Sequence, residues 1–326
     1  MINIYFNKSY FDRKRIFLTK KIKYTKFLVP YYNLCYKFNY PVNNNLIYSG
    51  PQKRINHLIK AFRKSSFTFN KDQFNNHYIV QYDDFGKNIL ENILKNNKKS
   101  QKIIIGPLMD IKSMQELTEM TQKFDNIKIL VASETGFKNL TEEMEMKVDF
   151  SNVLVIPSGV EFKNKISHKK RSGYSDALIY FKKRQPEELQ FIKNFLDKKR
   201  INYKLIEYGK YSNNKLTDYI NSSKFGILLS GTESQGFAVQ EMLSKNLPLY
   251  VWDKKINHYG GYNLSGTSVS MWNKNCGEIV NDKKEFEENF DFFFNNLKNY
   301  SPSIFVENNL TYEKFEQNLI NSFNSF

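Results

Sequence analysis

The sequence alternates short apolar runs with longer amphipathic stretches, and this rhythm continues through most of the 326-residue chain. The apolar runs are rich in Ile, Val, Leu, Phe and Tyr, which is typical of β-strands that are buried on both faces. Between them, apolar residues recur at helical spacing, as at Ile55, Leu58 and Phe62. Buried strands that alternate with helices predict parallel sheets covered on both faces, which is an α/β fold.

The expected strands fall into two sets. The first set is 45–50, 77–82, 102–107, 127–133 and 152–158, and the second is 176–181, 202–209, 224–231 and 248–253. A polar and charged stretch at 160–174 separates them. We therefore predict two doubly wound Rossmann-like domains facing a cleft, over residues 1–160 and 161–326. The last helix, 311–323, is expected to pack back on the N-terminal domain, whereas the first forty residues resist assignment.

The formal net charge of +16 is concentrated near the N-terminus. Residues 1–71 hold fifteen Lys or Arg and a single acid, Asp12, so the remaining 255 residues carry only +2. This asymmetry favours an anionic surface or partner for the N-terminal portion, with a solvated basic tail as the alternative. The basic amphipathic stretches 13–26 and 53–64 suit anionic lipid head groups, which indicates a peripheral membrane association. Their interleaved aromatic residues also suit nucleic acid.

Two further features bear on the cellular setting. Cys35 and Cys276 are the only cysteines, which favours reduced thiols and a cytoplasmic location. We expect no signal peptide, because charges begin at Lys8 and no apolar stretch followed by small residues is present. The longest apolar runs are also too short to span a bilayer.

The segment SGTESQGFAVQEMLSKNLPLYVWD, residues 230–253, carries the most chemical information. It joins a predicted buried strand to a helix, and such a junction presents backbone N–H groups and the positive end of the helix dipole to an anion. Gly236 lets a phosphate approach the backbone closely. Glu233 and Glu241 lie where carboxylates can bind sugar hydroxyls. These features together indicate a nucleotide-sugar site.

An ordinary helix start explains part of the same pattern. Thr232 and Gln235 match a capping box, and Asn246 followed by Leu247-Pro248 is a helix stop signal. Acidic residues in a first turn often only complement the helix dipole. On the residues alone, the chemical and the structural interpretations both stay open.

The segment resembles the donor-binding signature of retaining glycosyltransferases with the GT-B fold, of the group 1 or family 4 type. In that signature a glutamate, seven residues and a second glutamate run into a helix of small residues and then a proline-led strand. The matching positions are Glu233, Gly236, Glu241 and Pro248. The element IPSGVEF, 156–162, looks like the family's Pro-Asn-Gly-Val-Asp link between domains, with Ser158 in place of Asn.

The resemblance implies a role for each matching residue. Glu233 would bind hydroxyls of the donor sugar, and Glu241 would bind the ribose hydroxyls of the nucleotide. The backbone amides of Gly236, Phe237 and Ala238 would hold the diphosphate. The implied enzyme is a hexosyltransferase that uses a nucleotide-diphosphate sugar, retains the anomeric configuration and acts in surface glycan or glycolipid synthesis. Its acceptor would be a glycan or a lipid-linked hydroxyl.

The cations of this site are less well matched. Lys183 or Arg184 would stabilise charge on the leaving diphosphate, as is usual in sites without a metal. The family commonly has Gly-Arg followed by Lys-Gly, whereas this chain reads FKKRQPEE, and Lys210 is a further candidate. We expect no metal and no other cofactor, because no Cys/His cluster and no Asp-x-Asp occurs.

In an enzyme of this fold the N-terminal domain supplies the acceptor side. Gly50 after the first expected strand would line it, and Asp83 or Asp84 after the second would contact or deprotonate an acceptor hydroxyl. The alternative for both aspartates is a turn-forming role in YDDFG. Two other functions stay open: a nucleic-acid-binding or DNA-modifying protein that uses the basic N-terminal region, and another GT-B enzyme such as a sugar-nucleotide epimerase.

Overall fold

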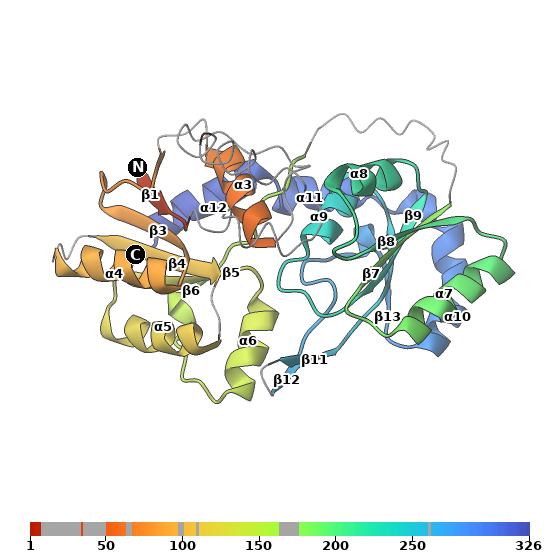
Figure 1. The fold of residues 1–326 in the computed structure, drawn as a ribbon, viewed down its shortest axis with the longest axis horizontal. Helices are drawn as coiled ribbons and strands as arrows, with labels where there is room; N and C mark the ends of the chain where they lie inside the picture. Colours follow the sequence, from red (N-terminus) through yellow and green to blue (C-terminus); the bar gives the residue numbers. More distant parts are fainter. Residues whose placement is uncertain are drawn as a thin grey trace. The chain divides into compact units, whose positions relative to one another are not determined.

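The computed structural model describes residues 1–7, 34, 50–62, 67–96, 101–108, 111–162, 176–259 and 262–326. The chain forms two compact units, each with its own parallel β-sheet (Figure 1). The first unit combines residues 1–134, 144–159 and 312–326, and the second combines residues 135–143 and 160–311.

The first unit contains a six-stranded sheet in the order β2-β1-β3-β4-β5-β6, in which every pair of neighbours is parallel. Its strands are β1 (Ile2–Tyr5), β2 (Phe67–Phe69), β3 (Asn76–Gln81), β4 (Lys102–Leu108), β5 (Ile127–Val131) and β6 (Val153–Val155). Its helices include α3 (Gly50–Phe62), α4 (Asp84–Lys95) and α5 (Ile111–Lys123), whereas α6 (Glu134–Glu143) belongs to the second unit from residue 135 onward.

The C-terminal helix α12 (Tyr312–Asn324) completes the core of the first unit. Phe315, Leu319 and Phe323 recur at helical spacing and are all buried in the same apolar cluster as α3. The rings of Phe62 and Phe315 lie 5.4 Å apart between centroids. A segment more than 240 residues away in sequence thus covers one face of this sheet.

The second unit contains a five-stranded parallel sheet in the order β13-β10-β9-β7-β8. Its strands are β7 (Ala177–Lys182), β8 (Tyr203–Glu207), β9 (Phe225–Ser230), β10 (Leu249–Trp252) and β13 (Gly277–Val280). Its helices are α7 (Pro186–Lys198), α8 (Asn213–Asn221), α9 (Phe237–Ser244), α10 (Lys283–Asn295) and α11 (Pro302–Asn309). An antiparallel hairpin, β11 (Ile256–Tyr259) and β12 (Tyr262–Ser265), is inserted after β10.

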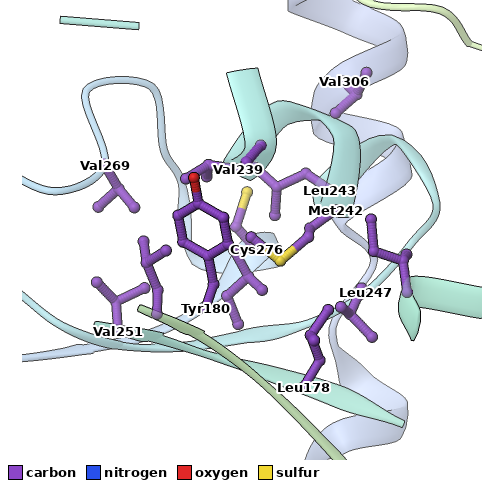
Figure 2. Close-up of a cluster of buried hydrophobic side chains, with 14 of the residues drawn as sticks. Leu178, Tyr180, Val239, Met242, Leu243, Leu247, Val251, Val269, Cys276 and Val306 are labelled. Carbon is purple, nitrogen blue, oxygen red and sulfur yellow. The ribbon is translucent and has the colours of Figure 1, made fainter. Parts of the chain in front are cut away.

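Both faces of this sheet are covered, and strand alternation explains how. In β7, Leu178 and Tyr180 enter one apolar cluster, whereas Ala177 and Ile179 enter the other. Figure 2 shows the first cluster, where Tyr180 stands among side chains of α9 and the sheet. The opposite cluster is rich in aromatic residues and includes Tyr250, whose ring centroid is 4.7 Å from that of Phe286. A sheet covered in this way needs continuous apolar strands, which is the pattern that the sequence has.

The predicted α/β fold with two parallel sheets is confirmed. All eight strands expected from residue 77 to residue 253 coincide with observed strands, within a few residues at each end. The short strands β1, β2 and β13 and the hairpin were not predicted, because runs of three or four residues carry too little periodicity. The expected strand 45–50 and the predicted break lie largely outside the described residues.

One prediction for the first unit is wrong, and one residue departs from another. Gly50 is the first residue of helix α3 rather than the end of a strand. Arg54 was expected on the solvent-facing basic side of 53–64, but it is only 1% exposed. The Arg54 guanidinium donates to the Tyr78 hydroxyl at 2.8 Å and stacks 5.0 Å from the ring centroid of Phe315. In the described part of the chain, no helix has the length and apolarity needed to cross a membrane.

Candidate functional site

The strand order of the second sheet defines where a ligand would bind. Numbered along the chain, its strands run 2-1-3-4-5, so β7 and β9 are the neighbours at which the direction of winding reverses. Open parallel sheets bind ligands at the carboxyl ends of the strands at this point. Lys182 ends β7 and is the register partner of Ser230, which ends β9. The segment that begins at Ser230 therefore starts at the switch point of its sheet.

An ion pair occupies the switch point. The Lys182 ammonium lies 2.5 Å from Oε1 of Glu233, and the Ser230 hydroxyl donates to the same oxygen at 2.9 Å. The two charged side chains are only 16% and 12% exposed. Lys182 also lies 4.6 Å from the ring centroid of Tyr208. A cation and a hydroxyl thus both hold Glu233, and these charge-assisted bonds offset the cost of removing its carboxylate from water.

The backbone around Glu233 is also fixed. The Gly231 amide donates to the Lys182 carbonyl at 2.8 Å, and the Glu233 amide donates to the Thr267 carbonyl at 2.9 Å. A Cβ atom on Gly231 would approach Cβ of Lys183 to 3.3 Å, so glycine allows the loops after β7 and β9 to pass closely.

Helix α9 begins immediately after this loop. Its N-cap is Gly236, which has φ +68° and makes no side-chain cap. The predicted capping box of Thr232 and Gln235 is therefore wrong, because the helix starts later than that pattern requires. Phe237 is the first helical residue and Ala238 the second, as the donor-site prediction requires. A glycine N-cap leaves the positive end of the dipole without an oxygen ligand from its own side chain.

The predicted helix stop at Asn246 is confirmed. Asn246 has φ +57°, its amide donates to the Leu243 carbonyl at 2.9 Å, and the Leu247 amide donates to the Met242 carbonyl at 3.1 Å. This is the pair of bonds that closes a helix in a Schellman motif.

Glu241 lies one turn inside α9 and is half-buried. Burial raises the pKa of Tyr211 to about 12, its hydrogen bond with Tyr180 acts in the opposite direction, and the negative charges of Glu241 and Glu233 add to the rise. The ring of Tyr211, in the segment after β8, lies 6.3 Å from that of Tyr180 between centroids.

The three predicted cations lie in different surroundings. Lys183 is exposed and has φ +52°, a left-handed conformation that is unusual for a residue with a side chain. Lys210 is 70% exposed and pairs with Glu207 at 2.5 Å. Arg184, by contrast, has a side chain that is 2% exposed.

Arg184 is engaged on every side. Its guanidinium makes a two-point contact with Glu188 at 2.5 and 2.8 Å and donates to the carbonyls of Ser230 and Trp252 at 3.3 and 2.7 Å. Burial alone would raise the pKa of Glu188, but the bonds from Arg184 and the Gln185 amide hold it below its ordinary value. Arg184 thus joins the ends of β7, β9 and β10, and its contact with a diphosphate stays a prediction.

The candidate acceptor residues belong to the first unit. Asp83 is the N-cap of α4, where Oδ1 accepts from the amides of Phe85 and Gly86 at 3.1 and 3.2 Å. Its Oδ2 accepts from Asn7 and Gln81 at 3.2 and 3.1 Å. Asp84 is exposed in the first turn of the same helix. The turn-forming alternative therefore describes Asp83 well, and Asp84 is the carboxylate that faces solvent.

Sequence reasoning missed the roles of Lys182 and Ser230. Lys182 stands in the same FKKRQPEE stretch as Lys183 and Arg184, which were given the cation role, and β7 extends to Lys182. Which of these adjacent cations faces Glu233 depends on where the strand ends, because successive side chains of a strand point to opposite faces. Within the described residues, no group of three or more His, Cys, Asp and Glu side chains is arranged to hold a metal ion.

At the level of sequence, no protein family and no curated protein matches the chain. Among solved structures, it is similar to AviGT4, a glycosyltransferase involved in avilamycin A biosynthesis, with a TM-score of 0.47 and 10% identity over 85% of this chain and 90% of that one. It is also similar to a mutant of S. aureus TarM in complex with fondaparinux, α-GlcNAc-glycerol and UDP, with a TM-score of 0.47 and 14% identity. That match covers 82% of this chain and 59% of TarM. A third is WaaG, a glycosyltransferase involved in lipopolysaccharide biosynthesis, with a TM-score of 0.40 and 9% identity over 85% and 96% of the two chains.

Proposed function

We propose that this chain is a glycosyltransferase that moves a sugar from a nucleotide-diphosphate sugar to a hydroxyl acceptor with retention, in surface glycan or glycolipid synthesis. One observation carries the proposal: the Lys182–Glu233 pair sits at the β7/β9 switch point, directly ahead of the glycine-capped start of α9. This is the position where a doubly wound sheet binds a nucleotide, and it combines a cation, a carboxylate and a helix N-terminus.

Each part of the ligand has a matching group. The diphosphate would rest on the amino end of α9, with close backbone approach allowed by Gly236. Glu241, one turn further along α9, would accept hydrogen bonds from the ribose hydroxyls. Glu233 would accept from hydroxyls of the sugar, since an ionised carboxylate is an acceptor only.

The transfer step assigns a role to the lysines. The bond between the anomeric carbon and the diphosphate oxygen breaks, and the electron pair stays on the diphosphate. The acceptor oxygen forms the new bond to the anomeric carbon, and its proton passes to the departing diphosphate oxygen. Lys182, and Lys183 on the exposed side of the same loop, would stabilise the negative charge that develops on the diphosphate. The reaction needs no metal in this scheme.

The first experiment is a thermal-shift titration with UDP-, GDP-, ADP- and CMP-sugars, followed by assay of the donor that binds. A ligand that binds only the native state raises the melting temperature with concentration. The expected result is a rise with one of the three diphosphate sugars, together with slow release of the matching nucleotide. A rise with the CMP-sugar alone would contradict the proposal, because that donor carries a single phosphate. The absence of any shift up to millimolar concentration of all four classes would contradict the proposal.

The second experiment substitutes the carboxylate. Glu233→Gln should lower donor turnover by about 100-fold or more, because a preorganised charge at the reacting sugar is removed. Glu187→Gln, on the exposed first turn of α7, is the matched control and should leave turnover unchanged. The double variant Glu233→Gln/Lys182→Met removes both charges and avoids an unpaired, largely buried lysine.

Product analysis separates the alternatives. Proton NMR of the product reports whether the anomeric configuration is retained. An altered free sugar formed without acceptor would identify an epimerase instead. The lipid-linked acceptor, the anionic membrane surface and the nucleic-acid alternative stay predictions, since the stretch 13–26 lies outside the described residues.

A further inference from the structure

We propose that Asp253 is a positioning residue that holds Glu233 in place through the segment 266–268. The inference rests on the proposed function, because it assigns a role in orienting the carboxylate that contacts the sugar. Asp253 directly follows β10, the strand beside β9, and no role for it follows from the donor-binding signature.

Asp253 is a buried carboxylate with a full set of donors. Its side chain is 1% exposed. Oδ1 accepts from the Ser268 amide at 2.6 Å, the Lys254 amide at 2.9 Å and the Thr267 hydroxyl at 3.0 Å. Oδ2 accepts from the same hydroxyl at 3.1 Å and from the Lys255 ammonium at 2.8 Å. A buried charge with this many donors is a strong and directional anchor.

The residues that Asp253 anchors are those that touch the site. The Thr267 carbonyl accepts from the Glu233 amide at 2.9 Å, and the Ser268 hydroxyl donates to the Ser230 carbonyl at 2.9 Å. Ser230 in turn donates its hydroxyl to the Glu233 carboxylate. The chain of bonds thus runs from Asp253 through two adjacent residues to both the backbone and the side-chain partner of Glu233.

The segment 266–268 and the loop that carries Glu233 pack closely against each other. A Cβ atom on Gly266 would lie 3.0 Å from Cγ2 and 3.1 Å from Cβ of Thr232, the residue before Glu233. The Gly266 amide donates to the Lys255 carbonyl at 2.8 Å, and this bond holds the first residue of the segment 266–268 in place. A shift of the segment 266–268 would therefore displace the Glu233 loop as well.

The kinetic test uses two variants that each weaken the anchor. Asp253→Asn keeps the size and one oxygen but turns an amide toward Lys255, and Thr267→Val removes the hydroxyl while keeping the carbonyl that binds Glu233. Each should lower kcat for donor hydrolysis by about 10- to 100-fold, since small displacements of a reacting group have effects of this size. The affinity for the free nucleoside diphosphate should change less than about twofold. The double variant should be no worse than the more damaging single one, because both act through one link.

Asp282→Ala is the matched control, because it removes the N-cap of α10 and so destabilises the same unit, while the Asp282 side chain bonds to the Glu285 amide rather than to the segment 266–268. It should leave kcat unchanged. Equal losses of kcat in Asp282→Ala and Asp253→Asn would mean that Asp253 acts only through general stability, and would overturn the proposal.

A second measurement needs no donor at all. Hydrogen exchange of the Glu233 amide should accelerate by about tenfold or more in Asp253→Asn and in Asp253→Ala, whereas amides within α10 should keep their rates. Unchanged protection of the Glu233 amide would overturn the role of Asp253 even if the wild-type enzyme is active. Failure of the wild-type protein to bind any nucleotide sugar, with the exchange result as expected, would instead overturn the proposed function alone.

Discussion

Two neighbouring lysines show how much depends on single residues at this site. Lys182 is the last residue of β7 and points to the Glu233 carboxylate. Lys183 leaves the strand in the left-handed conformation, with φ +52°, and its side chain is exposed. A left-handed residue with a Cβ atom costs roughly 1–2 kcal/mol, and such outliers occur preferentially at functional sites.

We expect Lys183→Gly to keep or raise the free energy of unfolding, by up to about 1 kcal/mol. The relief of the left-handed strain exceeds the extra chain entropy that glycine loses on folding. Lys193→Gly, inside α7, should instead cost about 1 kcal/mol. Urea unfolding of the two variants measures both effects. A loss of stability in Lys183→Gly similar to that in Lys193→Gly would show that the conformation of residue 183 is not strained.

The same variant also tests function. If Lys183 stabilises the leaving diphosphate as proposed, Lys183→Gly loses turnover while keeping stability. The two readouts therefore separate the chemistry of this lysine from its conformation.

At the scale of elements, α9 is short because both of its ends are defined by left-handed residues. Gly236 precedes its first residue, and Asn246 follows its last turn. Asn246 also binds the first turn of α11, since its Oδ1 accepts from the amide and the hydroxyl of Ser303 at 3.1 and 3.0 Å. The end of α9 is thereby joined to the start of α11.

Substitutions of Asn246 should separate these two contributions. Asn246→Gly keeps the left-handed conformation and loses only the bonds to Ser303, so about 1 kcal/mol of stability should be lost. Asn246→Ala loses the bonds and also strains the backbone, so the loss should be about 2 kcal/mol. The difference between the variants is measured by the midpoints of urea unfolding, provided that the dependence of the unfolding free energy on urea concentration is the same in both. Equal midpoints for the two would rule out a contribution from the backbone conformation.

At the scale of the whole molecule, the first unit is assembled from pieces far apart in the chain. His57 in α3 lies where they meet: its Nδ1 is 2.9 Å from the Gly159 carbonyl, and its ring packs edge-on against Tyr312 at 5.5 Å. Because a carbonyl only accepts, Nδ1 carries the proton. Burial, reinforced by the positive charges of Lys53 and Lys60, lowers the pKa of His57 to about 3, although the bond to Gly159 acts in the opposite direction.

This buried histidine predicts that the first unit loses stability in mild acid. Between the ordinary pKa of 6.5 and the folded value of about 3, the unfolded chain takes up a proton that the folded one does not. The contribution of His57 to stability is therefore constant above about pH 7 and falls as the pH is lowered. Going from pH 7 to pH 5 should cost about 2 kcal/mol from this group alone.

His57→Asn, which keeps a donor for Gly159, should flatten this dependence. The free energy of unfolding from urea titrations at pH 5, 6 and 7 measures it. The same slope in the wild type and in His57→Asn would show that other groups cause the acid sensitivity.

The periodicity of the sequence determined most of the fold, because a strand buried on both faces must be apolar throughout and a covering helix must be amphipathic. It also identified the segment with Glu233, Gly236 and Glu241, since glycine and acid placement at a strand–helix junction is a local property. Short strands such as β1 escaped prediction because their pairing partners, and not their own residues, define them.

The tertiary structure decided which charged side chains are available to bind a ligand. Arg54 and Arg184 look like surface cations in the sequence, yet both are buried against partners from distant parts of the chain, including Phe315 for Arg54 and the Ser230 and Trp252 carbonyls for Arg184. The choice of Lys182 over Lys183 as the partner of Glu233 depends on the residue at which β7 ends, since successive side chains face opposite sides of a strand. Solvation and pairing of a charge are set by distant parts of the chain, so they emerge only when the chain is folded.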